Sequence, residues 1–303
     1  MKNFTNRVAV ITGAASGFGR EFAFLGASFG MKLVLADVQQ EALSVTANEV
    51  ENAGTKVIAQ LCDVSKGEQV EALANAAMKR FGAVHLVFNN AGVGAGGLVW
   101  ENTRADWEWV LGVNVWGVIN GVRIFTPLML ECAKHDPDYE GHIVNTASMA
   151  GLLNPPTMGI YNVSKHAVVS LTESLYHDLS LVEAPIGASV LCPYFVQTGI
   201  IQSHKHRPDE LKSVDGPTIS QQVSQAVLET AVSSGKVSAA DVAQRTFDAI
   251  RENTFYIYSH PTALGNVQRR MEDIVTGRNP SDPYEAAPHV REKLQAGMKG
   301  QSA

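Results

Sequence analysis

Tyr161 and Lys165 are the residues of this sequence whose types and spacing most directly suggest chemistry. They stand at positions i and i+4, so on a helix they share one face, where a lysine ammonium favours the phenolate over the phenol. Lowering the tyrosine pKa by roughly 3 units from its ordinary value of about 10 requires about 4 kcal/mol from the lysine, other positive charge and hydrogen bonds. Such a pair could act as a general base. Because the spacing also occurs by chance on many helices, the interpretation depends on the residues around it.

A glycine-rich turn follows the first apolar run of the chain and is typical of a phosphate-binding site. Gly13, Gly17 and Gly19 allow a positive φ, close approach of a pyrophosphate and tight packing of the next helix. Their spacing, G-x-x-x-G-x-G, differs from the commoner G-x-G-x-x-G, and a glycine trio alone could form only a tight turn. Asp37, after the second apolar run, is either a solvated strand-end carboxylate or an acceptor for adenosine ribose hydroxyls that repels a 2′-phosphate. Since residues 38–40 include no Lys or Arg, the sequence favours NAD over NADP.

The elements that must position these residues alternate between short apolar runs and longer helical patterns. This alternation predicts βαβ units and a parallel sheet buried on both faces. The predicted fold class is α/β, a single-domain, Rossmann-type doubly wound parallel sheet of seven strands, with the ligand beyond the carboxyl ends of the strands. The expected strands are 8–11, 32–36, 56–61, 84–88, 142–146, 188–191 and 255–258, and the expected helices are 17–29, 39–53, 66–81, 103–134, 158–181 and 239–252.

Composition restricts the possible partners. A chain of 303 residues with 45% hydrophobic and 18% charged residues fits one large α/β domain or two small ones. Its net charge of −6 and the absence of a Lys/Arg cluster argue against nucleic acid or an anionic membrane surface as a partner. Cys62, Cys132 and Cys192 are widely spaced, which disfavours disulfides or zinc and favours a reducing compartment. With no room for a signal peptide before the first strand and no run of about 18 apolar residues, the expected location is cytoplasmic.

Taken in order, the motifs resemble those of the short-chain dehydrogenases/reductases over residues 5 to about 260. The resemblance is to the branch with the glycine loop 12–19, Asp63-Val64 after the third strand and the run 89–92 (Asn-Asn-Ala-Gly) after the fourth. Several motifs in order are far more specific than any one, although 89–92 alone could be only a strand-terminating turn. The resemblance implies that Asn89 lines the cofactor site and that NAD is bound by Gly13, Ser16, Gly17, Phe18, Gly19, Asp37, Asp63, Val64, Asn90, Ala91, Gly92, Tyr161, Lys165, Pro193, Val196 and Thr198.

The same resemblance implies hydride transfer between a secondary alcohol and NAD, with ketone reduction as the reverse reaction. Tyr161 as phenolate would take the alcohol proton, while Ser148 would hold the substrate oxygen by a hydrogen bond. Lys165 would lower the tyrosine pKa and bind the nicotinamide ribose. Asn114, where the family has a helix with a distorted backbone, would pass the proton through water toward solvent. Without these partners, Ser148 would be an ordinary strand-end serine and Asn114 a buried, satisfied amide.

The expected substrate pocket is apolar and departs from the family pattern at one position. Family members usually have Pro-Gly after the sixth strand, whereas this chain has Pro193-Tyr194, which places a large ring near the nicotinamide end of the cleft. Phe195 could stack on an aromatic substrate or only pack, and Lys205 or Arg207 could hold an anionic group. A nonpolar secondary alcohol or ketone is the expected substrate. Its expected contacts are Ser148, Ala150, Leu153, Met158, Tyr194 and Phe195.

Three further segments carry expectations. Residues 199–236 look irregular and are predicted to be a mobile lid over the substrate, and His204 and His206 within it fit a solvated turn better than a metal site. The extension 261–303, beyond a catalytic domain of residues 1–260, is expected to pack as a helix over the pocket or a partner. Four tryptophans near the fourth helix suggest core or subunit contact, and the family commonly pairs its long helices, so a homodimer or homotetramer is expected. These tryptophans are Trp100, Trp107, Trp109 and Trp116.

Two other functions fit part of the sequence. A non-catalytic NAD sensor would keep the glycine loop and Asp37, but nothing would require it to keep Asn114, Ser148, Tyr161 and Lys165 together. A nucleotide-sugar epimerase or dehydratase shares the tyrosine and lysine, but it would show a different glycine spacing and a larger C-terminal substrate domain. Turnover of secondary alcohols with NAD separates the three.

Overall fold

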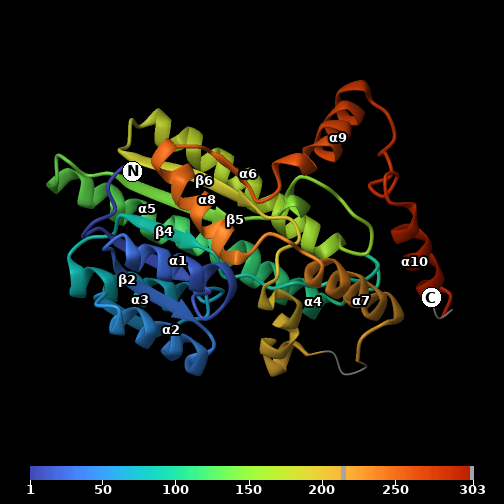
Figure 1. Ribbon diagram of the computed structural model, residues 1–303, viewed down its shortest axis with the longest axis horizontal. Coiled ribbons are helices and arrows are strands. Elements are labelled where there is room, and N and C mark those ends of the chain that lie inside the picture. Colours follow the sequence, from blue (N-terminus) through green and yellow to red (C-terminus); the bar gives the residue numbers. More distant parts are fainter. Residues whose placement is uncertain (213–215, 301–303) are drawn as a thin grey trace.

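One parallel sheet forms the centre of the molecule (Figure 1). The computed structural model describes residues 1–212 and 216–300. Within them, seven strands lie in the order β3-β2-β1-β4-β5-β6-β7 and all neighbours are parallel. The predicted doubly wound sheet is therefore confirmed, and its strand order reverses between β1 and β4, the point where such sheets bind ligands. The strands are β1 Val8–Thr12, β2 Lys32–Asp37, β3 Val57–Leu61, β4 Leu86–Asn89, β5 Gly141–Thr146, β6 Ile186–Cys192 and β7 Tyr256–Tyr258.

Helices cover both faces of the sheet because the strands are apolar on both sides (Figure 1). Each layer of helices closes its own hydrophobic cluster against the strands. One face carries α1 (Gly17–Ser28), α2 (Gln40–Asn52) and α8 (Ala239–Glu252), and the other carries α3 (Gly67–Phe81), α5 (Gly117–His135) and α6 (Gly159–Leu181).

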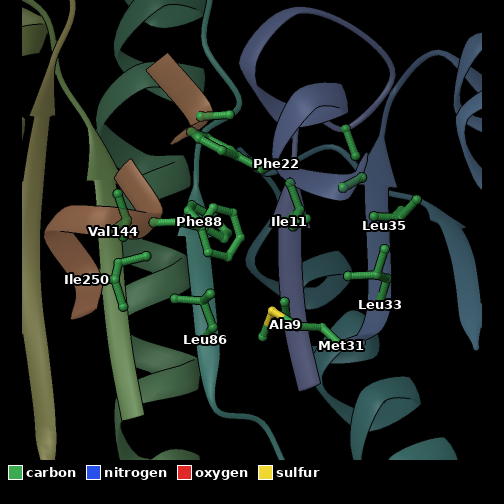
Figure 2. Close-up of a cluster of buried hydrophobic side chains, with 14 of the residues drawn as sticks. Ala9, Ile11, Phe22, Met31, Leu33, Leu35, Leu86, Phe88, Val144 and Ile250 are labelled. Carbon is green, nitrogen blue, oxygen red and sulfur yellow. The ribbon is translucent and has the colours of Figure 1, made fainter. Parts of the chain in front are cut away.

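Aromatic packing fixes the layer of α1 and α8 on the middle of the sheet. The ring of Phe22 from α1 stacks on that of Phe88 from β4, with centroids 4.3 Å apart, and Phe247 from α8 lies 5.6 Å from Phe88. Figure 2 shows Phe88 on β4 between Ile11 of β1 and Val144 of β5, with Phe22 close by. Offset aromatic contacts of this kind stabilise by about 0.5–1.5 kcal/mol beyond the area they bury. This packing holds the carboxyl ends of β1 and β4, and so the glycine turn, in fixed register.

The helical stretch before β5 is long and interrupted. It consists of α4 (Arg104–Leu111), a π-helical turn over Gly112–Trp116, and α5. An 18-residue window of Arg104–His135 has a mean hydropathy of 1.3, which by length and composition would suffice to cross a membrane. The stretch packs on one side against α3 and strands β4 and β5, and 39% of the window is buried. Its π-helical turn lies at the position where the family resemblance implies a distorted backbone.

The segment expected to be irregular contains a regular helix. Residues 199–236 include 3₁₀ turns at Gly199–His206 and Asp209–Leu211 and then α7 (Ile219–Ser233), while residues 213–215 lie outside the described part of the chain. The expectation of irregular structure is therefore wrong for α7. The helix begins where it does because Thr218 and Gln221 form a capping box, each side chain bonding the other's backbone amide.

The C-terminal extension forms two helices outside the sheet layers. α9 (Gly265–Thr276) projects from the body, and the chain then returns so that α10 (Pro288–Met298) lies beside α7 (Figure 1). The two helices approach closely, since a Cβ added at Gly297 would lie 2.8 Å from Val223 of α7. The extension is thus helical where the sequence predicts a helix, and α7 and α10 together form the outer wall of the site.

Candidate active site

A cavity of about 1350 Å³ opens at the carboxyl ends of the strands. One end lies at the turn after β1 and the strand ends of β2 and β4, and the other lies between α7 and the C-terminal extension. Pockets for one small molecule are commonly about 300–1,000 Å³, so this cavity has room for a dinucleotide and a substrate together. All the predicted catalytic and substrate residues except Asn114 line it, as do all the predicted cofactor residues except Gly19 and Asn89.

The glycine turn has the geometry that a phosphate site requires. Gly13 and Gly17 have φ values of +67° and +52°, a region that other residues rarely enter. A Cβ at Gly19 would lie 2.0 Å from the carbonyl oxygen of Gly13, so this glycine allows α1 to pack on the turn rather than lining the cavity. Ser16 is the N-cap of α1, but its side chain caps no amide. The first amides of α1 therefore remain available to an anion, as at other helix N-termini that bind phosphate.

The far end of the cavity suits an adenosine. Asp37 is buried, and its two carboxylate oxygens accept hydrogen bonds from the amides of Ala15 and Gln39, both at 3.0 Å. The carboxylate is held in place with lone pairs left for ribose hydroxyls. Asp63 is fixed in a similar way, because its Oδ1 accepts from the amide and hydroxyl of Ser65 at 2.9 and 2.7 Å. The donor and acceptor set fits a dinucleotide.

The run after β4 ties the two central strands together. The amide of Asn90 donates to Thr12 Oγ1 at 2.9 Å and its side chain donates to the Thr12 carbonyl at 3.0 Å. Asn89, expected to line the cofactor and to hold the sheet, does only the second: its side-chain amide donates to Asn145 Oδ1 on the neighbouring strand at 2.8 Å, and it does not line the cavity. Part of this motif therefore holds the sheet, and Asn90, Ala91 and Gly92 line the cavity.

α6 brings Tyr161 and Lys165 to the cavity, one turn apart. Both side chains are buried, and the lysine Nζ lies 5.6 Å from the centroid of the tyrosine ring. Lys165 also donates to the carbonyl oxygen of Thr146, at the end of β5, at 2.9 Å. Helix spacing and a strand-end acceptor thus fix the pair, and Ser148 lines the same part of the cavity.

The electrostatics of this pair, without a bound cofactor, show why the sequence analysis required positive charge beyond the lysine. Burial raises the pKa of Tyr161 to about 12, and an interaction with the Ser148 hydroxyl opposes the rise only in part. Burial likewise lowers the pKa of Lys165 to about 8. Each charged form loses its solvation in the closed protein interior. The expected lowering of the tyrosine pKa is therefore not a property of this chain alone, and it requires further positive charge next to the phenol.

Asn114 lies at the centre of the π-helical turn and is completely buried. Its side chain is fully used, because Oδ1 accepts from the Val93 amide at 2.8 Å while Nδ2 donates to the Val93 carbonyl and to Ser164 Oγ. The side chain of Asn114 therefore fits the alternative considered from the sequence, a buried amide whose hydrogen bonds are all made within the protein. The distorted backbone is present as well, and π turns within helices occur frequently at functional sites. A water relay through Asn114 stays a prediction.

Ser148 and Tyr194 both lie next to Pro193 in the wall of the cavity. Ser148 Oγ accepts from the Ala150 amide at 3.1 Å and donates to the Pro193 carbonyl at 3.4 Å. The Tyr194 amide donates to Ser259 Oγ at 2.8 Å, and its half-exposed ring lies 4.4 Å from that of Phe195. Tyr194 therefore places an aromatic pair on the cavity where the family pattern has glycine.

Sequence reasoning expected residues 199–236 and the C-terminal extension to cover the substrate or a partner, but it named no residue of α7 or of the extension as a substrate contact. Residues of α7 and of the C-terminal extension line the substrate end of the cavity, and of these only α7 has a local signal in the sequence, the capping box at Thr218. Arg207, considered as an anion clamp, is used inside the protein, since its Nη1 donates to Asp106 at 2.5 Å and its guanidinium lies over the Trp109 ring. The missed lining residues include Val227, Leu228, Ala231, Tyr284, Ala287 and Val290.

Comparison with known proteins decides the family. A family model described as short chain dehydrogenase matches residues 7–209. The chain belongs to the short-chain dehydrogenase/reductase family. Enzymes of this family are oxidoreductases, so the chain is assigned to that class.

Relatives of known name and structure cover almost the whole chain. A CLA biosynthesis dehydrogenase/reductase of Lactiplantibacillus plantarum is 34% identical, over 92% of this chain and 97% of that protein. The C alpha-dehydrogenase of a Sphingobium species is 30% identical, over 96% and 93%. A short chain dehydrogenase/reductase from Burkholderia phymatum, solved in complex with NAD, is 57% identical with a TM-score of 0.90, over 93% of this chain and 99% of that chain. The short-chain dehydrogenase/reductase architecture therefore extends into the C-terminal extension.

Proposed function

We propose that this protein is an NAD-dependent oxidoreductase that interconverts an apolar secondary alcohol and its ketone. The observation that carries the proposal is the joint placement of Tyr161, Lys165 and Ser148 on one cavity that also reaches the glycine turn. The walls between them are apolar, with Ala150, Leu153, Met158 and Phe195 among the lining residues. Two relatives, named a CLA biosynthesis dehydrogenase/reductase and a C alpha-dehydrogenase, are in keeping with this class of reaction.

The residues divide the work as follows. Tyr161 accepts the alcohol proton on its phenolic oxygen during oxidation and returns it during reduction. Ser148 holds the substrate oxygen with its hydroxyl, and Lys165 keeps the phenol side of the cavity positive. Bound NAD supplies the hydride acceptor and a positive nicotinamide ring. Because burial raises the pKa of Tyr161 to about 12, the added positive charge would favour the phenolate and so tie proton removal to cofactor binding.

NAD rather than NADP is proposed as the cofactor. The buried carboxylate of Asp37 is fixed by two amides at the adenosine end, where it favours ribose hydroxyls and repels a phosphate. The Burkholderia relative, 57% identical, was solved with NAD. Gly13, Ser16, Gly17, Phe18, Asp63 and Val64 line the same end of the cavity.

A homodimer or homotetramer in the cytoplasm is proposed as the working form. Enzymes of this family usually form oligomers. Trp100 and Trp116 are 76% and 57% exposed, so both rings are available for contact with a partner subunit. Only Trp109 of the four tryptophans is buried in the core. All three cysteines are free in the described part of the chain, as a reducing compartment requires.

Turnover with a panel of apolar secondary alcohols tests the proposal. The protein is incubated with NAD or NADP and each alcohol, and formation of the reduced cofactor is followed by absorbance, with Tyr161→Phe as the control. Reduction of NAD by the wild type but not by the variant supports the proposal. Binding of NAD without turnover of any alcohol or ketone would instead favour the sensor.

A further inference from the structure

The α7 helix is seated directly on the backbone of the loop that follows β4. A Cβ added at Gly96 would lie 2.0 Å from Ser224 Oγ, and one added at Gly97 would lie 2.7 Å from Gln221 Cγ. Neither position has room for a side chain. Ser224 is itself buried, so a serine hydroxyl of α7 lies at the point of closest approach between the helix and the loop.

Thr157, in the segment between Ser148 and Tyr161, has a strained backbone. Its φ of +63° lies in the left-handed region, which a β-branched residue rarely enters and which costs on the order of 1–3 kcal/mol. The carbonyl oxygen of Thr157 accepts two hydrogen bonds, from the Gly97 amide at 2.7 Å and from Ser224 Oγ at 3.0 Å. Strain of this kind persists where several contacts hold it, and here the contacts come from two different segments.

Thr157 immediately precedes the start of the catalytic helix. Met158 is the N-cap of α6, and its carbonyl accepts from the Asn162 amide at 2.8 Å. The Asn162 side chain donates in turn to the Pro155 carbonyl at 2.9 Å. Tyr161 lies in this first turn, so the direction in which the chain leaves Thr157 sets the position of the phenol. A shift of about 1 Å at a reacting group can lower a rate by about two orders of magnitude.

We propose that Ser224 is a positioning residue for Tyr161, acting through the carbonyl of Thr157. When α7 is seated over the substrate end of the cavity, the Ser224 hydroxyl helps hold the strained turn, and Tyr161 is in place. When α7 lifts, that hydrogen bond is lost, the turn can relax, and the phenol leaves its position. Closure over the substrate is thereby coupled to assembly of the catalytic group. The inference rests on the proposed function, because it concerns the activity of Tyr161.

Ser220 provides a matched control one turn earlier on the same helix. It is also buried, and its hydroxyl donates to Glu101 Oε2 at 2.6 Å and accepts from the Leu98 amide at 2.9 Å. Ser220 thus fastens α7 to the same loop without touching Thr157. If Ser224 acted only by seating α7, Ser220→Ala and Ser224→Ala would have the same consequences.

Hydrogen exchange of the full-length protein tests the coupling without any substrate. Ser224→Ala is expected to speed amide exchange in residues 158–163, at the start of α6, whereas Ser220→Ala is expected to speed it only in residues 97–101. In turnover, Ser224→Ala is expected to lower kcat about fivefold, the effect of losing one ordinary hydrogen bond, with little change in KM. Equal exchange patterns or equal kcat values in the two variants would overturn the proposal.

A second substitution tests the role of the strain. Thr157→Gly removes the cost of the positive φ, so the turn no longer depends on the hydroxyl that holds it. The drop in kcat caused by Ser224→Ala should therefore be smaller in the Thr157→Gly background, and an undiminished drop would contradict the role assigned to Ser224. If the wild type turned over no alcohol or ketone, the proposed function would fail, while the exchange patterns would still decide the coupling.

Discussion

The two ends of the cavity are built in different ways. The cofactor end depends mainly on segments close to the strand ends: a glycine turn with two positive φ values, the free amides at the start of α1, the Asp37 carboxylate held by two of the nearby amides, and strand ends tied together by Thr12 and Asn90. The substrate end is made of side chains, which come from α6, α7 and the C-terminal extension, far apart in the sequence. Backbone geometry leaves a recognisable spacing in a sequence, whereas an apolar wall assembled from distant helices does not. The sequence therefore indicates the class of reaction but does not indicate the substrate.

The largest effect should come from separating chemistry from cofactor binding. Tyr161→Phe removes the only group assigned to proton transfer, which typically contributes a factor of about 10²–10⁴, while the glycine turn and Asp37 stay intact. We expect kcat to fall by about three orders of magnitude and the Kd for NAD, measured by quenching of tryptophan fluorescence, to change less than about twofold. Residual activity near that of the wild type would show that Tyr161 is not the proton-transfer group.

A substitution at the cofactor end of the cavity should change the use of NAD and NADP without changing the binding of the alcohol. In Asp37→Ala, hydrogen bonds from the ribose to a charged acceptor are lost, which lowers kcat/KM for NAD by about 10- to 100-fold. Removing the negative charge should also raise kcat/KM for NADP, because a like charge no longer opposes the 2′-phosphate. The KM for the alcohol at saturating NAD serves as the control and should stay constant. An unchanged ratio of NAD to NADP efficiency would place cofactor selection elsewhere.

The pH dependence of turnover should show whether charge near Tyr161 controls the ionisation of its phenol. Tyr161 has a pKa raised to about 12 without cofactor, so oxidation, which needs the phenolate, should become faster with rising pH, by up to about tenfold per unit. Ketone reduction needs the phenol and should be constant at low pH and fall at high pH. Lys165 has a pKa lowered to about 8, so its ammonium favours the phenolate near neutral pH. Lys165→Met removes that charge, and kcat/KM for the alcohol, measured at saturating NAD, should therefore be lower near pH 7 and rise only at higher pH. The same midpoint in both proteins would argue that the lysine does not tune the tyrosine.

Local signals in the sequence predicted what depends on local geometry. The glycine spacing predicted the turn at Gly13 and Gly17, and the i and i+4 spacing predicted the shared helix face of Tyr161 and Lys165. The start of α7 also has a local signal in the sequence, the capping box that begins at Thr218. The many Ser and Gln residues around it nevertheless made the segment look irregular. These features involve residues close together in the chain, which is why spacing alone could indicate them.

Features that depend on tertiary packing could not be predicted in the same way. The high pKa of Tyr161 arises from burial by segments that the sequence does not place next to it. Tyr284 reaches the cavity only because α10 returns to lie beside α7, and nothing near Tyr284 in the sequence indicates this. The pairing of Arg207 with Asp106 joins two segments distant in the chain, so an arginine that looked free to bind an anion is already occupied.

The smallest effect on activity should come from truncating a residue in the apolar wall of the substrate end. Two valines of α7 provide a test variant and a matched control. Val227 and Val223 are one turn apart on the same helix and both half-buried, but Val227 lines the cavity whereas Val223 faces Gly297 of α10. Truncating an apolar wall residue costs about 1 kcal/mol of substrate binding, or about fivefold. Val227→Ala should therefore raise the KM for a good apolar substrate about fivefold and leave the KM for NAD unchanged.

Val223→Ala should change neither constant and only lower the unfolding temperature slightly, because the same methyl groups are lost from the contact between helices. Equal KM values for the alcohol in the two variants would mean that α7 does not line the substrate site, and that the substrate end is formed by the residues between Ser148 and Tyr161 alone.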